Sequence, residues 1–68
     1  MNEKQLVKHK IQQLVHLHAI YMHTICGLDV DQVAEYNSLY ADWKAGLLTL
    51  SEIEEDINEY VRLRNLDK

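Results

Sequence analysis

The feature of this sequence that most constrains its fold is the absence of proline, combined with the presence of only two glycines, Gly27 and Gly46. Proline breaks the interior of a helix, and glycine commonly ends a helix in the left-handed conformation. The two glycines therefore predict helix ends and divide the chain into three helical segments. We expect helices over about residues 3–26, 30–45 and 50–66, within a single domain spanning residues 1–68.

Local capping signals predict where the second and third helices begin. Thr49 is followed three residues later by Glu52, which is the spacing of a capping box, and Leu48 and Ile53 have the spacing of a hydrophobic staple. The segment 29–32 predicts a second capping box, with its first aspartate as the N-cap. Because the connection between Gly46 and Thr49 is short, we expect the second and third helices to form an antiparallel hairpin. The predicted fold is an all-α three-helix bundle, with the long first helix packed across this hairpin.

The apolar side chains of the first helix follow a heptad-like spacing that is typical of a helix–helix seam. The seam is formed by Val7, Ile11, Leu14, His18, Tyr21, Ile25 and Leu28. We expect a homodimer of the chain to form through the first six residues of this seam, from Val7 to Ile25. The first helix should be about 36 Å long against about 24 Å for each neighbour, so the apolar turns near Leu6 and Val7 are expected to overhang.

The second helix has two stripes, and the sequence leaves open which one is buried. The bulky stripe consists of Val33, Tyr36, Tyr40, Trp43 and Leu47, and the small-residue stripe of Ala34, Ser38, Ala41 and Ala45. Aromatic side chains fill cores, but Tyr and Trp also dominate the binding energy of protein interfaces. The face that remains outside is the candidate interface.

Composition and charge exclude several classes of protein. The chain has 68 residues, of which 47% are hydrophobic and 26% charged, and this composition is typical of a small folded domain. The only cysteine, Cys26, cannot form an internal disulfide, which indicates a reducing compartment. No apolar run approaches the roughly 18 residues of a membrane span. We therefore expect a cytoplasmic protein that neither crosses nor binds a membrane.

No arrangement of residues predicts an enzyme, a cofactor or a metal site. His9, His16 and His23 recur every seven residues, which places them along one outer face but about 10 Å apart, too far to share an ion. A soft-ligand series is formed by His18, Met22 and Cys26, yet methionine and a lone thiol at helical spacing are more often core residues. A catalytic Cys26 would also need an oriented base and an oxyanion site.

The function that the sequence favours is a non-enzymatic protein–protein interaction module: an adaptor, an accessory protein or an inhibitor. Its small size and the surplus of apolar residues on the first helix motivate this prediction. The candidate partner-binding residues are Leu6, Val7, Tyr36, Tyr40 and Trp43.

Two alternatives involve nucleic acid, either bound or imitated. Residues 1–28 carry three basic and one acidic side chains, so the first helix could hold a single strand while Tyr or Trp stacks on its bases. Conversely, an acidic face on the third helix could mimic a phosphate backbone and inhibit a DNA-binding protein. This face consists of Glu52, Glu54, Glu55, Asp56 and Glu59, and its simpler interpretation is a solvated surface that complements the helix dipole.

Three short segments resemble the small three-helix YqgQ-like proteins of Gram-positive bacteria. They are Gln12–Leu14, Ile20–Thr24, and Leu39–Tyr40 followed by Gly46–Leu47. The resemblance implies a three-helix fold, and a nucleic-acid role has been suggested for that family. The chain departs from the family at residues 25–27, where Ile-Cys-Gly lacks the basic residue of the family's turn.

Overall fold

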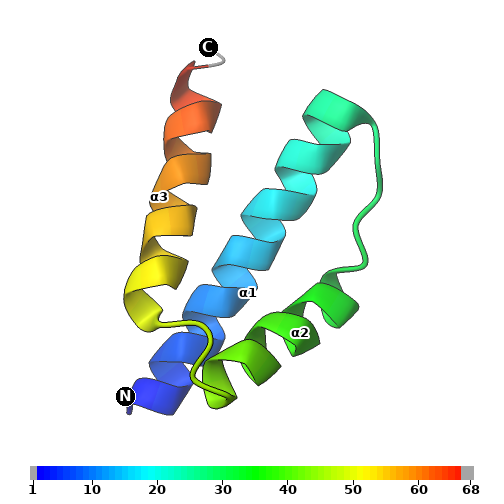
Figure 1. The fold of residues 1–68 in the computed structure, drawn as a ribbon. Coiled ribbons are helices and arrows are strands. Elements are labelled where there is room, and N and C mark those ends of the chain that lie inside the picture. The colour runs from blue at the N-terminus through cyan, green and yellow to red at the C-terminus, as the bar shows by residue number, and fades with distance from the viewer. Residues whose placement is uncertain (1, 67–68) are drawn as a thin grey trace.

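The computed structural model describes the backbone of residues 2–66 and the side chains of residues 2–65, and this part of the chain is entirely helical apart from its connections. Helix α1 (Glu3–Tyr21) continues into a π-helical turn, η1 (Met22–Cys26), and is followed by α2 (Gln32–Lys44) and α3 (Leu50–Leu66) (Figure 1). No strand occurs within residues 2–66. The prediction of an all-α, three-helix fold is confirmed.

The first helix ends where the glycine predicts, but its last turn is not α-helical. The Gly27 backbone is left-handed, with φ of 68°, and its N–H donates to the His23 carbonyl at 3.1 Å. The Leu28 N–H reaches further back, to the Met22 carbonyl, at 3.2 Å. The turn before Gly27 is thus wider than an α-helical turn.

The predicted start of the second helix is wrong by two residues. The N-cap is Asp31, whose carboxylate accepts a hydrogen bond from the Ala34 N–H at 3.1 Å. Asp29 instead lies in the connection with its side chain 98% exposed, near His23. Both aspartates can cap a helix, and only the path of residues 27–31 decides which one meets free N–H groups.

The ends that flank the α2–α3 connection agree with the sequence signals. Gly46 is left-handed, with φ of 79°, and the Leu47 N–H donates to the Asp42 carbonyl at 2.9 Å, which completes a Schellman motif. At the start of α3 the Thr49 hydroxyl accepts from the Glu52 N–H and donates to the Glu52 carboxylate, both at 3.2 Å. Thr49 is therefore the N-cap, as predicted.

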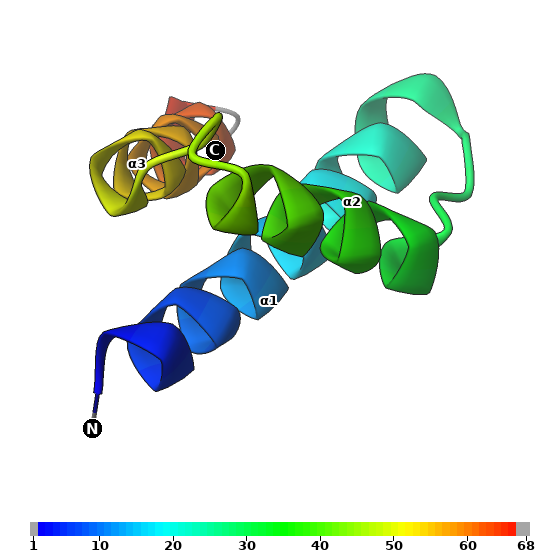
Figure 2. The same ribbon diagram turned by 60° about the horizontal axis from the view of Figure 1, so that its bottom comes forward.

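Helix α1 lies between the other two helices and contacts both, whereas α2 and α3 contact each other far less. From their short connection the two helices diverge, α2 along one side of α1 and α3 along the other (Figures 1 and 2). The hairpin is therefore open rather than closed. The radius of gyration is 12.3 Å, whereas a compact chain of this length is expected to have about 10.9 Å.

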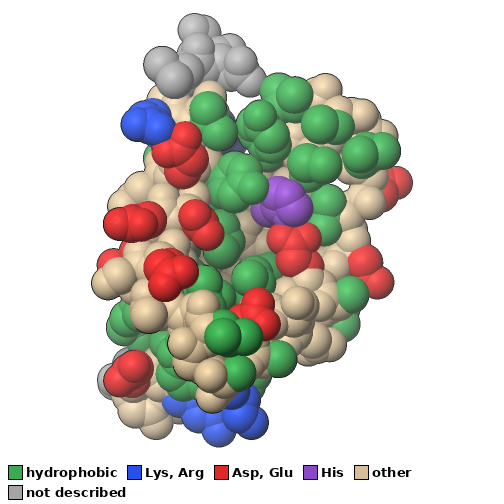
Figure 3. All heavy atoms as spheres, in the orientation of Figure 1, with side chains coloured by type: hydrophobic (Ala, Val, Ile, Leu, Met, Phe, Trp, Pro, Cys, Tyr) green, Lys and Arg blue, Asp and Glu red, His purple; other side chains and the backbone are tan. Residues whose placement is uncertain are grey.

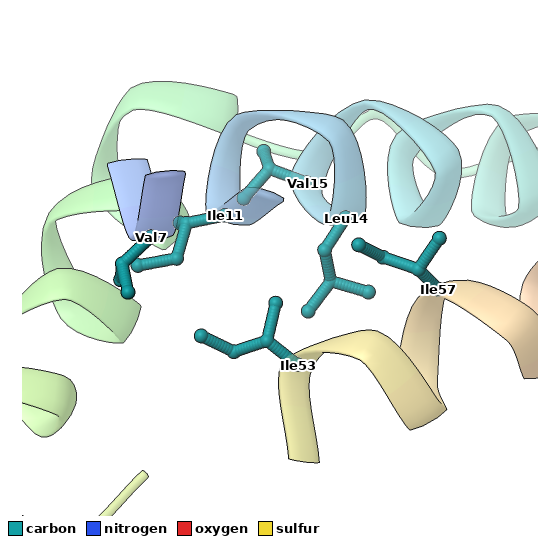
Figure 4. Close-up of a cluster of buried hydrophobic side chains, with 6 residues drawn as sticks. All are labelled: Val7, Ile11, Leu14, Val15, Ile53 and Ile57. Atoms are coloured by element: carbon teal, nitrogen blue, oxygen red, sulfur yellow. The ribbon is translucent and has the colours of Figure 1, made fainter. Parts of the chain in front are cut away.

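The core is small and sits on the N-terminal half of α1. Six apolar side chains are buried: Val7, Ile11, Leu14, Val15, Ile53 and Ile57 (Figure 4). The bulky stripe of α2 faces this core through Tyr36, Tyr40 and Trp43. The alanines and the serine of the small-residue stripe are exposed. The sequence left open which stripe is buried, and the structure places the small-residue stripe on the outside.

No helix of residues 2–66 combines the length and the apolar character needed to cross a membrane.

The predicted overhang at the start of the first helix is wrong. Val7 has no exposed surface and Leu6 is half-buried, and Val7 belongs to the core cluster with Ile53 from the first turn of α3 (Figure 4). The unmatched apolar turns are at the opposite end, where Ile25 is 52% exposed and Leu28 is 55% exposed.

Candidate functional site

An apolar groove lies between the C-terminal end of the first helix and the C-terminal half of α3. It has a volume of about 280 Å³ and is lined by Leu17, Ile20, Tyr21, Thr24, Ile25, Tyr60, Leu63 and Arg64. Ile20 and Ile25 remain 37% and 52% exposed. Figure 3 shows hydrophobic side chains gathered on the surface over this end of the first helix. We call this site the apolar groove.

Two local features produce the apolar groove. Leu17 and Ile20 extend the apolar surface of α1 beyond the heptad seam, so this part of the helix is apolar on more than one face. In addition, α1 and α3 diverge towards their C-terminal ends (Figure 1), and the Tyr60 ring of α3 contacts the seam at His18 and Tyr21. At the end of the seam, Ile25 and Leu28 remain 52% and 55% exposed.

A second, acidic groove continues from the apolar groove along the same face of the molecule. It has a volume of about 400 Å³ and is lined by Leu14, His18, Tyr21, Glu35, Leu39, Asp56, Glu59, Tyr60 and Leu63. Tyr21, Tyr60 and Leu63 line both grooves, so the two grooves adjoin, and we refer to the pair together as the channel. In Figure 3 acidic side chains lie around the middle of this face, on both sides of the histidine.

All three helices meet in the acidic groove around His18. The His18 Nδ1 lies 2.6 Å from a carboxylate oxygen of Glu35, and the two side chains are 27% and 26% exposed. The ring of Tyr60 lies 5.6 Å from the His18 ring and 5.5 Å from the Tyr21 ring, measured between centroids. Burial raises the pKa of Tyr60, and the nearby Glu35 and Asp56 carboxylates raise it further because they disfavour a phenolate.

The predicted aromatic site forms a ladder that is packed against the core. The Tyr36 and Tyr40 rings are stacked with centroids 6.3 Å apart, and the Tyr40 and Trp43 rings are 5.8 Å apart. The ammonium groups of Lys8 and Lys44 lie 5.4 and 5.7 Å from the centroid of Tyr40. Leu6 and Val7, the other predicted partner residues, are half-buried and buried. Most of this set therefore has a structural role in the described chain.

The predicted acidic face of α3 is exposed throughout but does not act as a unit. Asp56 and Glu59 line the acidic groove, whereas Glu52, Glu54 and Glu55 do not. Glu59 also forms an ion pair with Arg62.

The predicted dimer seam is divided by the core. Val7, Ile11 and Leu14 are buried by the chain's own helices, while His18 and Tyr21 are half-buried and line the grooves. The whole seam cannot contact a second copy while this core is intact. A homodimer stays a prediction, with only Ile25 and its surroundings exposed for it.

The histidines and the cysteine do not converge. Within the described part of the chain, no three side chains of His, Cys, Asp or Glu are placed to hold a metal ion. His9, His16 and His23 are exposed on the outer face, as their spacing predicts. The expectation that Cys26 fills the core is wrong, because its thiol is exposed.

Comparisons of this chain with family models, with curated proteins and with solved structures find no match. The resemblance to YqgQ-like proteins stays a prediction, and the function has to be argued from the two grooves.

Proposed function

We propose that this chain is a non-enzymatic protein–protein interaction module that binds an amphipathic helix of a partner protein in the apolar groove. The observation that carries the proposal is the open groove itself, because it is lined mainly by apolar side chains from two helices that no described helix covers. Helix-in-groove recognition uses this kind of surface, with apolar anchors one helical turn apart.

The exposed surface gives this proposal an energetic basis. The chain exposes 4963 Å², whereas a folded monomer of 8.0 kDa is expected to expose about 4,450 Å². Fully burying an Ile or Leu side chain stabilises a complex by about 1.5–3 kcal/mol. The half-exposed groove residues would each contribute part of this when a partner helix covers them.

The test is capture of a partner protein by the tagged chain, with nuclease present, and its comparison between two matched variants. Ile25→Glu places a charge in the apolar groove, and Val33→Glu places the same charge at a side chain that is 71% exposed and outside it. We expect Ile25→Glu to lose the captured protein while Val33→Glu retains it. Equal capture by both variants would refute the groove as the docking site. Circular dichroism establishes that both variants are folded.

A second candidate function is binding of single-stranded nucleic acid, and one observation favours it. The fold brings Lys8 from α1 next to Lys44 from α2, so the aromatic ladder has two cationic neighbours rather than one. Aromatic side chains beside a basic groove are typical of single-strand binding. However, both ammonium groups already lie over Tyr40, so a base would have to displace them or stack on Trp43. This function predicts affinity that falls steeply with salt and is lost in Lys8→Gln/Lys44→Gln.

A further inference from the structure

The channel, made up of the apolar groove and the acidic groove, also indicates the charge of its occupant. One end of the channel is apolar, around Ile20 and Ile25, and the other end carries the carboxylates of Glu35, Asp56 and Glu59. The shared residues Tyr21, Tyr60 and Leu63 lie between the two ends. A ligand that fills the channel must therefore present apolar side chains at one end and meet negative charge at the other.

The carboxylates of the acidic groove are only partly neutralised by the protein. His18 contacts Glu35, and Arg62 forms an ion pair with Glu59. Asp56 is exposed beside them. With the formal net charge of −4 on the whole chain, this end of the channel attracts cations and repels phosphates.

A second copy of this chain matches the channel less well than a separate basic helix does. The basic helix of the chain is α1, with Lys4, Lys8 and Lys10, but its apolar side chains Val7 and Ile11 are already buried in the core. The acidic side chains of the channel lie on α2 and α3, and only Arg62 and Arg64 on α3 offset them, so a second copy would add carboxylates to this end. We therefore take the occupant to be a helix of another protein. Self-association of the chain that Ile25→Glu abolishes would overturn this choice.

We infer that the partner helix is a basic amphipathic helix, whose apolar face covers Ile20 and Ile25 and whose Lys or Arg side chains lie over Asp56 and Glu59. This inference rests on the proposed function and adds the chemical class of the partner. The apolar groove contributes most of the affinity, and the acidic groove selects helices by charge and fixes their orientation. The same carboxylates disfavour anionic lipid surfaces and nucleic acids as occupants of this end.

The test uses two synthetic peptides of about 18 residues, long enough to be partly helical in water. Both peptides have leucines at helical spacing along one face. At one end, the polar positions are Lys in the first peptide and Glu in the second. Binding of the labelled peptides to the full chain is measured by fluorescence anisotropy. We expect the Lys peptide to bind at least about ten times more tightly, with an affinity that weakens between about 50 and about 500 mM salt.

Two matched double variants locate the charge effect. Asp56→Asn/Glu59→Gln removes two carboxylates that line the acidic groove, and Glu54→Gln/Glu55→Gln removes two from the same helix outside it. We expect the first variant to bind the Lys peptide about five-fold more weakly than the wild type does, and the second variant to bind it less than about two-fold more weakly. An equal effect of both variants would show general attraction to an acidic protein and would overturn the inference.

The outcomes separate this inference from the proposed function. If both peptides bind equally and Ile25→Glu abolishes binding, the apolar groove is a docking site and the inference about charge is wrong. If Ile25→Glu leaves peptide binding unchanged, the proposed site itself is wrong.

Discussion

The two halves of the first helix have similar apolar sequences but opposite environments. In the N-terminal half, Val7 and Ile11 have no exposed surface because α2 and α3 lie on either side. In the C-terminal half, Ile25 occupies the same seam and is 52% exposed. The difference shows that the first half of this helix is packed in the core, whereas its second half presents an apolar surface.

The largest difference in the free energy of unfolding is expected when the same substitution is made at the two ends of the seam. This pair of variants tests the comparison most directly. Ile11→Ala removes a fully buried side chain and should lower the free energy of unfolding by about 2–5 kcal/mol. Ile25→Ala, at a half-exposed side chain, should lower it by about 0.5 kcal/mol or less. Urea denaturation followed by circular dichroism measures both values. Equal losses would mean that the second half of the helix is as well packed as the first.

A smaller effect is expected at Thr49, which fixes the start of α3 beside the buried half of α1. Thr49→Ala removes the hydroxyl that accepts the Glu52 N–H, and loss of an N-cap typically costs about 1 kcal/mol. Ser51→Ala, two residues further along the helix and exposed, is the matched control and should change stability by less than about 0.5 kcal/mol. A Thr49→Ala variant as stable as the control would contradict the assignment of this cap.

The border between the two halves can be probed through the contact of His18 with Glu35. Glu35→Gln keeps the shape of the side chain but removes the charge that His18 contacts at 2.6 Å. Because both side chains are about one-quarter exposed, we expect a loss of about 0.5–1 kcal/mol at neutral pH. In the double variant with His18→Gln, the effect of Glu35→Gln should largely disappear, and additive losses would show that the pair is not coupled.

The smallest effect is expected in alkaline solution and concerns Tyr60, which lies where the two grooves meet. Burial raises its pKa above the ordinary tyrosine value of 10.0, and the carboxylates of Glu35 and Asp56 raise the pKa further. The folded state therefore holds the phenol proton more tightly than the unfolded state, and stability falls as the pH rises above about 10. Tyr60→Phe should lose less stability than the wild type over this range, as measured by urea denaturation at each pH. A steeper loss in the variant would contradict the sign of the shift.

Part of the candidate site was readable from the sequence, and part was not. The surplus of apolar residues on the first helix already favoured an interaction surface there, and Leu17 and Ile20 in the apolar groove belong to this surplus. The pairing of His18 with Glu35 had no signal, because the two residues are separated by 17 positions and lie on different helices. For the same reason the sequence placed the free surface at Leu6 and Val7, the wrong end of the helix.

By itself the sequence determined the number of helices, their approximate limits and three of their end signals, Gly27, Gly46 and Thr49. These features depend on backbone preferences and on hydrogen bonds within a few residues. Only the tertiary structure decided which half of the apolar seam is covered, which stripe of α2 faces inward, and which aspartate caps α2. These features depend on the angles at which α2 and α3 leave their connection and cross α1. Such angles follow from packing between residues distant in sequence, and helical periodicity does not encode them.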